Sequence, residues 1–127
     1  MEIFPADNVT NLLQTYLDVQ SRRAQVVAGN IANTDTPGYV AKDLDFENYL
    51  REAAEQSALP ASRQNPNALA QPSIVDQPTT VVGLDGNTVD MGGEMAKMAQ
   101  TGTNFNFGAK MLQSRLRLLR TAIKEGR

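Results

Sequence analysis

Residues 30–46 read NIANTDTPGYVAKDLDF, and this stretch ends a long helical pattern and starts a different kind of chain. Thr36 precedes a proline, which pushes it out of the helical region of backbone space. Pro37-Gly38 fits the central pair of a type II turn, because proline fixes φ and glycine accepts a positive φ. Asn33 tolerates the left-handed conformation that often ends a helix. The stretch therefore predicts a helix stop and a tight turn, with Tyr39 large enough to pin the turn against a helix.

The segment before this stretch, residues 8–33, is predicted to be helical, with Asp7 or Asn8 as its N-cap. Its apolar residues recur with alternating spacings of four and three, which is typical of a coiled-coil seam. Gln20 interrupts that seam. The apolar seam positions are Leu13, Leu17, Ala24, Val27 and Ile31. A helix of this length spans about 39 Å at 1.5 Å per residue.

The segment after the turn is predicted to be extended from Val40 and then helical from about Asp45 to Glu55. Three acidic residues lie close together at this point, which raises the question of a metal site: Asp43, Asp45 and Glu47. The alternative is a solvated turn followed by a negatively charged helix start, which the helix dipole favours. The chain has no His, and no second acidic cluster follows at ligand spacing. We therefore favour the helix start and predict no metal site.

Residues 57–88 have a different composition. Proline, serine, glutamine and asparagine dominate the segment, as in a linker or a loosely ordered lobe. A weak strand signal at Thr79–Val82 is followed by the turn dipeptide Asp85-Gly86. The pattern indicates an irregular middle with a small β-hairpin.

Residues 90–124 show the strongest periodicity, with Asp90 as the expected N-cap. Spacings of four and three alternate over this whole segment. The seam consists of Met91, Met95, Met98, Gly102, Phe105, Ala109, Leu112, Leu116, Leu119 and Ile123. Each glycine in a helix costs about 1 kcal/mol relative to alanine. Because glycines concentrate in the first half, we expect the stretch TGTNFNFG at 101–108 to be flexible or bent.

The sequence thus predicts a mainly α fold, in which long N- and C-terminal helices pair in coiled-coil fashion around an irregular Pro-rich middle. Four segments follow: an N-terminal helix within 1–35, a turn, extended piece and short helix within 36–56, the middle at 57–88, and a C-terminal helix within 89–127. A lone hairpin of the two helices would leave a surplus of apolar residues exposed: Leu12, Tyr16, Val19, Met111 and Leu118. Because exposed apolar stripes mark partner surfaces, we expect the isolated chain to be partly disordered and to order on assembly.

The composition argues against catalysis. The chain has neither Cys nor His, so the commonest general base and the commonest soft metal ligands are missing. Ser and Thr are plentiful, but no activating base accompanies them. The stretch GLDGN at 83–87 is too short for a phosphate loop. We therefore predict no catalytic residues and no cofactor.

The net charge and the hydropathy of the chain limit the kinds of partner that it can bind. The net charge is -2, so bulk charge does not favour nucleic acid. Residues 110–127 are basic, which fits either a solvated helix end or a site for phosphate or an acidic protein. We favour the helix end, because no aromatic residues interleave the cations. No apolar run approaches about 18 residues and no cleavable signal is visible, so no membrane span is expected.

Four stretches resemble the family of flagellar axial proteins, which comprises rod, hook and hook-associated proteins. They are GNIANTDTPGY at 29–39, VAKDLDF at 40–46, DGNTVDMGGEMAKMAQ at 85–100 and LLRTAIKEG at 118–126. The short chain is most similar to the proximal rod members. The resemblance implies a non-catalytic subunit of the bacterial flagellar basal-body rod, which packs helically, transmits torque and lines the export channel.

The resemblance also implies partners and a location. The partners are further copies of the chain, other rod proteins, the adaptor FliE, the MS ring and the flagellar type III export apparatus, with no nucleic acid. The location is the periplasmic rod, reached without a cleaved signal peptide. The turn that docks the first helix against a neighbour is expected to consist of Asn30, Asn33, Thr36, Pro37, Gly38 and Tyr39.

Three alternatives stay open at this point. The chain could be a cytoplasmic coiled-coil adaptor or chaperone, a nucleic-acid binder acting through its basic end, or another rod protein of the same family.

Overall fold

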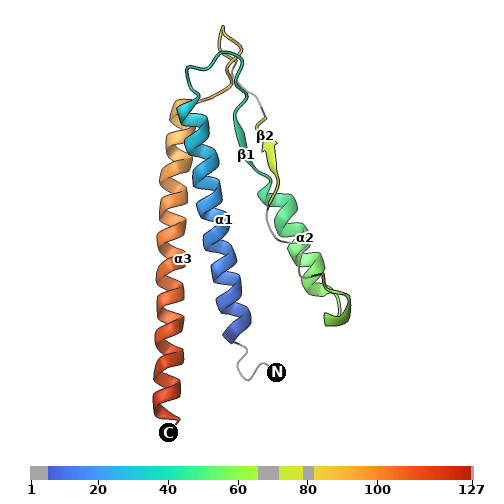
Figure 1. The fold of residues 1–127 in the computed structure, drawn as a ribbon, viewed down its shortest axis with the longest axis vertical. Helices are drawn as coiled ribbons and strands as arrows, with labels where there is room; N and C mark the ends of the chain where they lie inside the picture. Colours follow the sequence, from blue (N-terminus) through green and yellow to red (C-terminus); the bar gives the residue numbers. More distant parts are fainter. Residues whose placement is uncertain (1–5, 66–71, 79–81, 127) are drawn as a thin grey trace.

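A computed structural model describes residues 6–65, 72–78 and 82–126. Two long helices, α1 (Ala6–Ala32) and α3 (Met91–Glu125), pack side by side and run antiparallel (Figure 1). We call the end where α1 stops and α3 starts the head of the pair. From the head extends an arm made of β1 (Lys42–Leu44), α2 (Phe46–Ala58), a short 3₁₀ helix at Ala61–Arg63 and β2 (Ile74–Asp76). The predicted mainly α fold with paired terminal helices is confirmed.

Helix α1 differs from the prediction at both ends. It starts at Ala6, so the prediction of Asp7 or Asn8 as N-cap is wrong, because both lie inside the helix. No non-glycine residue described in the structure has a positive φ, so the left-handed conformation expected for Asn33 is also wrong. Asn33 instead donates from Nδ2 to the carbonyl of Gly29 at 2.8 Å. The backbone N–H of Asn33 donates to the same carbonyl at 3.1 Å, so this terminal carbonyl is satisfied without a left-handed residue.

Helix α3 runs without interruption over 35 residues, so the predicted bend at 101–108 is wrong. Tertiary packing explains why, since Thr101 and Gly108 are both buried. A Cβ atom added at Gly108 would lie 2.9 Å from Tyr16 Cδ1 and 3.0 Å from Leu17 Cδ2. The glycine therefore lets α1 approach closely, and the resulting packing outweighs its low helix propensity.

The face that α3 turns toward α1 is polar and small. Its buried residues, Glu94, Thr101 and Gly108, are seven apart in sequence, and each directly precedes a member of the predicted seam. Several apolar seam residues consequently stay between 40% and 57% exposed. We call them the apolar stripe, which consists of Met91, Met95, Phe105, Leu116 and Ile123. The chain's own α1 thus covers only part of the α3 seam.

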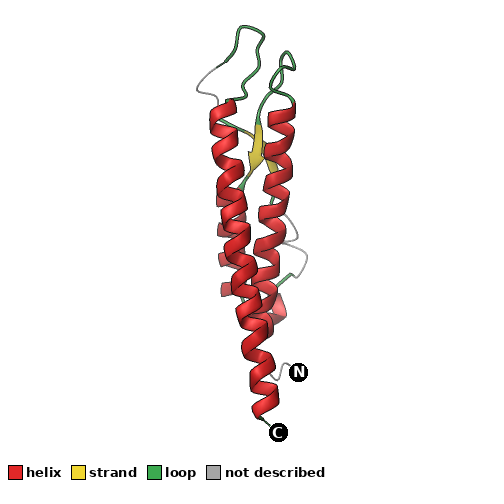
Figure 2. Cartoon of the chain, turned by 90° about the vertical axis from the view of Figure 1, so that its left-hand side faces the viewer, coloured by secondary structure: helices red, strands yellow, loops and turns green. Residues whose placement is uncertain are grey.

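The arm is held by a two-stranded antiparallel sheet in which Lys42 pairs with Asp76 and Leu44 with Ile74. Figure 2 shows these strands level with the upper part of the helix pair. The sheet joins the segment after the turn to the middle of the chain, so it is not the local hairpin predicted for Thr79–Val82. Residues 79–81 lie outside the described residues, and Val82 is not in a strand.

Two other predictions for this region are confirmed. Helix α2 starts directly after Asp45, whose Oδ1 accepts a hydrogen bond from Asn48 N at 3.3 Å. The Asp85-Gly86 dipeptide forms a turn, in which Gly86 has φ +80° and donates to the carbonyl of Gly83. Among the described residues, α2 packs against neither α1 nor α3.

Candidate functional site: a polar junction at the head

The turn of the opening stretch lies at the head and contacts the segment that precedes α3. Tyr39 N donates to the carbonyl of Thr36, and Gly38 has φ +72°, which is the predicted turn around Pro37-Gly38. Gly38 N donates to the carbonyl of Asp85 at 2.9 Å. A Cβ atom at Gly86 would lie 3.6 Å from Gly38 Cα. Two glycine turns from distant parts of the chain thus pack together.

Asn87 fastens the end of α1 to this segment. Its side chain is 7% exposed, and Nδ2 lies 2.8 to 2.9 Å from the carbonyl oxygens of Asn33, Thr34 and Thr36. Its Oδ1 accepts a hydrogen bond from Val89 N. The carbonyls left over at a helix end need donors, and one asparagine supplies them here.

Thr88 continues the same connection toward the strand. Its backbone N–H donates to the carbonyl of Tyr39, and its hydroxyl oxygen accepts from Ala41 N at 2.8 Å. The sequence stretches 29–39 and 85–100, which carried the resemblance from opposite parts of the chain, therefore lie against each other.

Asn30 is the central residue of the junction and is fully buried. Its Nδ2 donates to the carbonyl of Lys42 at 2.6 Å and to Glu94 Oε2 at 3.0 Å. Its Oδ1 accepts from Tyr39 OH at 3.1 Å and from Lys42 N at 3.0 Å. An asparagine side chain has two donor hydrogens and two acceptor lone pairs, so its capacity is used completely. One side chain thus connects α1, the turn, β1 and α3.

Glu94 is the second buried member, at 1% exposed. Its other oxygen, Oε1, accepts from Gln77 Nε2 at 2.9 Å and from Lys97 Nζ at 3.3 Å. Lys97 also donates to Gln77 Oε1 at 2.7 Å. A buried carboxylate is costly unless it is paired and hydrogen-bonded, and here both conditions are met.

The acidic residues that suggested a metal site have separate structural partners. Asp43 accepts from Arg23 Nε at 3.2 Å and Nη2 at 3.3 Å, and Lys97 Nζ lies 3.7 Å away. Asp45 caps α2, as described above. Glu47 pairs with Arg51 at 3.5 Å on the surface of the same helix. Among the described residues, no three His, Cys, Asp or Glu side chains gather as a metal site.

An exposed ion pair crosses the small sheet at the edge of this junction. Lys42 Nζ lies 2.8 Å from Asp76 Oδ1. The hydrogen bond to Asp76, together with its negative charge, raises the pKa of Lys42 above the ordinary value.

The junction brings together only part of the predicted turn set. Asn30, Asn33 and Tyr39 point inward to partners in their own chain, as the hydrogen bonds above show, whereas residues 35–38 are exposed. Sequence reasoning missed the residues that complete the junction: Arg23, Gln77, Asn87, Glu94 and Lys97. The seven-residue spacing of Glu94, Thr101 and Gly108 was the available signal, but the apolar seam one position away obscured it.

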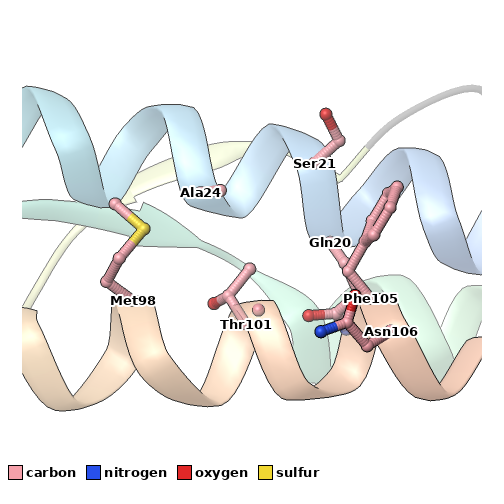
Figure 3. Close-up of a pocket in the computed structure, with 8 residues that line it drawn as sticks. Gln20, Ser21, Ala24, Met98, Thr101, Phe105 and Asn106 are labelled. Atoms are coloured by element: carbon pink, nitrogen blue, oxygen red, sulfur yellow. The ribbon is translucent and has the colours of Figure 1, made fainter.

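A second feature lies midway along the helix pair, on the side of the apolar stripe. It is a hollow of about 280 Å³ lined by Gln20, Ser21, Ala24, Met98, Thr101, Gly102, Phe105 and Asn106. Figure 3 shows Met98 and Phe105 at its two ends, with Thr101 between them. A Cβ atom at Gly102 would meet nothing within 4 Å, so the glycine leaves the hollow open.

None of the described helices is long and apolar enough to cross a membrane.

Comparison with known proteins identifies the class to which this architecture belongs. No protein-family model matches the chain. The chain is 31% identical to the flagellar basal body rod protein FlgB of Salmonella typhimurium, an alignment that covers 94% of this chain and 96% of the relative. It is 30% identical to FlgB of Escherichia coli and 28% identical to FlgB of Yersinia enterocolitica, over the same shares of each chain.

The terminal helix pair with its small arm is thus the structure of a flagellar basal body rod protein. Within that class the chain belongs to the FlgB family. The alternative within the class, the related rod protein FlgC, is not favoured, because these relatives are FlgB proteins.

Proposed function

We propose that the chain is a structural subunit of the proximal rod, which packs helically with further copies of itself and with other rod proteins. The observation that carries this proposal is the apolar stripe, which stays half exposed along the whole of α3. An apolar surface of this length is unusual for a protein that acts alone and is typical of an interface. Its function therefore lies in assembly rather than in catalysis.

The head junction supports a mechanical role. Asn30 and Glu94 join α1, α3 and β1 through buried hydrogen bonds, and Asp43 ties the arm to Arg23. Because fully satisfied buried networks rigidify a structure, a twist applied to the arm passes to the helix pair. With their long axis along the rod, the paired helices would transmit torque and line the export channel.

The partners and location of the subunit form part of the same proposal. In this account the chain passes through the flagellar type III export apparatus and joins the periplasmic rod. Its neighbours there are the adaptor FliE, the MS ring and other rod proteins. Of the predicted turn set, the exposed residues Thr36, Pro37 and Gly38 would meet a neighbour, while Asn30, Asn33 and Tyr39 hold the corner in shape.

Fractionation of flagellated cells tests the proposal. The full chain carrying a small epitope tag should co-purify with detergent-extracted basal bodies, and cells lacking the chain should be non-motile. A chain that stays entirely in the cytoplasm would instead support the adaptor or chaperone. DNA binding that weakens steeply with salt would support the nucleic-acid binder.

A further inference from the structure

In the part of the chain that the structure describes, helix α2 has no other helix to pack on. Among the described residues it packs against neither α1 nor α3. Its apolar positions, Phe46, Leu50 and Ala53, recur at a spacing of three to four, so they share one face. Leu50 on that face is 53% exposed. The described residues therefore cover this apolar face only in part, and Phe46 and Ala53 are half-buried while Leu50 is exposed.

Acidic residues border this face. Glu47 and Glu52 fall on its two sides at 100° per residue, and Glu55 lies on the opposite side of the helix. Arg51 is the single basic residue of α2. The partner that fits this helix is therefore apolar and cationic.

The C-terminal half of α3, residues 110–125, has this complementary character, and we call it the foot. It exposes Leu116, Leu118 and Ile123. It also carries five cations against one acidic residue: Lys110, Arg115, Arg117, Arg120 and Lys124. In the part of the chain that the structure describes, none of these cations makes an ion pair.

Among the described residues, the foot is partly uncovered because α3 extends past the start of α1. Asn30 bonds Glu94 and Tyr16 meets Gly108, and the residue numbers of each pair add up to 124. In this antiparallel pair, residues whose numbers add up to 124 therefore lie at the same height. Ala6 lies level with residue 118, so residues 119–125 extend past the start of α1.

We propose that α2 of one copy docks on the foot of a second copy. The inference rests on the proposed function, because it assigns one of the contacts between subunits. The two surfaces match in length: α2 has 13 residues, or about 20 Å, and the foot is about 24 Å long at 1.5 Å per residue. Apolar contact supplies the affinity, and the charges at the rim set orientation and partner choice.

The contact forms between copies rather than within one. In Figure 1, α1 lies between α3 and α2, so the arm of a chain is separated from its own foot. The junction at the head fixes this arrangement, since Asp43 and Lys42 tie the base of the arm to α1.

Disulfide trapping tests this contact, and no native thiol can compete because the chain has no cysteine. Two full-length variants, Leu50→Cys and Leu116→Cys, are purified, distinguished by mass, mixed at high concentration and oxidised. We expect the mixed disulfide to form several-fold more than with the control Asn48→Cys. Asn48 is exposed and points away from the apolar face of α2. A yield no higher than that of the control would overturn the inference.

Charge reversal provides a second arm of the test. Glu47→Lys with Glu52→Lys in the arm, or Arg120→Glu with Lys124→Glu in the foot, should each reduce the mixed disulfide several-fold. Combining the two reversed chains should restore it, and high salt should weaken the original pair. No recovery in the combined sample would overturn the inference.

The two experiments distinguish a failure of the docking proposal from a failure of the proposed rod function. A chain that enters basal bodies but gives no mixed disulfide refutes the docking of α2 alone. A chain that forms the mixed disulfide but never enters basal bodies refutes the rod function alone.

Discussion

The head and the foot of the helix pair differ in how far one chain satisfies its own surface. At the head, Asn30 and Glu94 are buried, and every oxygen of their side chains accepts a hydrogen bond. Lys97 at the head forms an ion pair with Glu94. At the foot, Leu116 and Ile123 are about half exposed, and the cations of the described residues have no ion pair. The comparison teaches that the chain satisfies its own polar groups at one end of the helix pair, whereas at the other end it leaves apolar and cationic surface exposed.

The largest effect is expected from removing the central side chain of the head. Asn30→Ala leaves Glu94 Oε2, Tyr39 OH and the backbone groups of Lys42 without their buried partner. Each unsatisfied group costs about 1–3 kcal/mol, so we expect a loss of about 3 kcal/mol or more. Urea denaturation followed by circular dichroism measures it.

The matched control for this substitution is Asn106→Ala, at an exposed asparagine of α3. It should change the free energy of unfolding by less than about 0.5 kcal/mol. If Asn30→Ala and Asn106→Ala lowered the free energy of unfolding equally, the buried hydrogen bonds of the head would contribute no special stability, which would contradict the account.

The next effect in size concerns the turn at the head. Gly38→Val forces a β-branched side chain into φ +72°, at a cost of about 2 kcal/mol. Nothing lies within 4 Å of the new Cβ, so the cost arises in the backbone alone. We expect impaired motility in swim plates. Gly29→Ala lies inside α1, and nothing lies within 4 Å of its new Cβ either, so it should leave motility unchanged. Normal motility of Gly38→Val would count against the turn.

Alanine substitutions at two glycines of α3 should change the stability of the chain by smaller amounts and in opposite directions. Gly108→Ala places a Cβ 2.9 Å from Tyr16, and overpacking should destabilise the chain by about 1 kcal/mol. Gly102→Ala meets open space, so the gain in helix propensity should stabilise the isolated chain by up to about 1 kcal/mol. Thermal melts of both variants check the prediction. The same sign for both would mean that the contact of α1 with Gly108 does not decide the effect of the added Cβ atom.

The sequence predicted the long helices, the Pro-Gly turn and the helix start near Asp45, because each depends on residues near one another in the chain. It misjudged the stretch 101–108, since a glycine that is weak in an isolated helix becomes favourable where another helix needs to approach. It also missed Asn87 and Glu94 as members of the junction. Their partners at the end of α1 and in the turn that follows lie 51 or more residues away, and no local pattern reports such a contact.

The smallest effect is expected at the exposed pair of Lys42 and Asp76. Because Asp76 raises the pKa of Lys42 above 10.5, the pair stabilises the fold at neutral pH. That contribution is lost only as the pH rises through the raised pKa. Asp76→Asn should therefore lower stability slightly at pH 7 and have no effect at a pH above that range. Denaturation curves at the two pH values test this, and a larger effect at high pH would contradict it.

Hydrogen exchange of the isolated full-length chain tests the central claim most directly, because it reads the head and the foot in one experiment. We predict that backbone amides of residues 24–32 and 94–105 exchange slowest, and that those of residues 116–125 exchange close to the rate of an unfolded peptide. Equally slow exchange at the head and the foot would show that the chain completes both ends by itself, and would contradict the account.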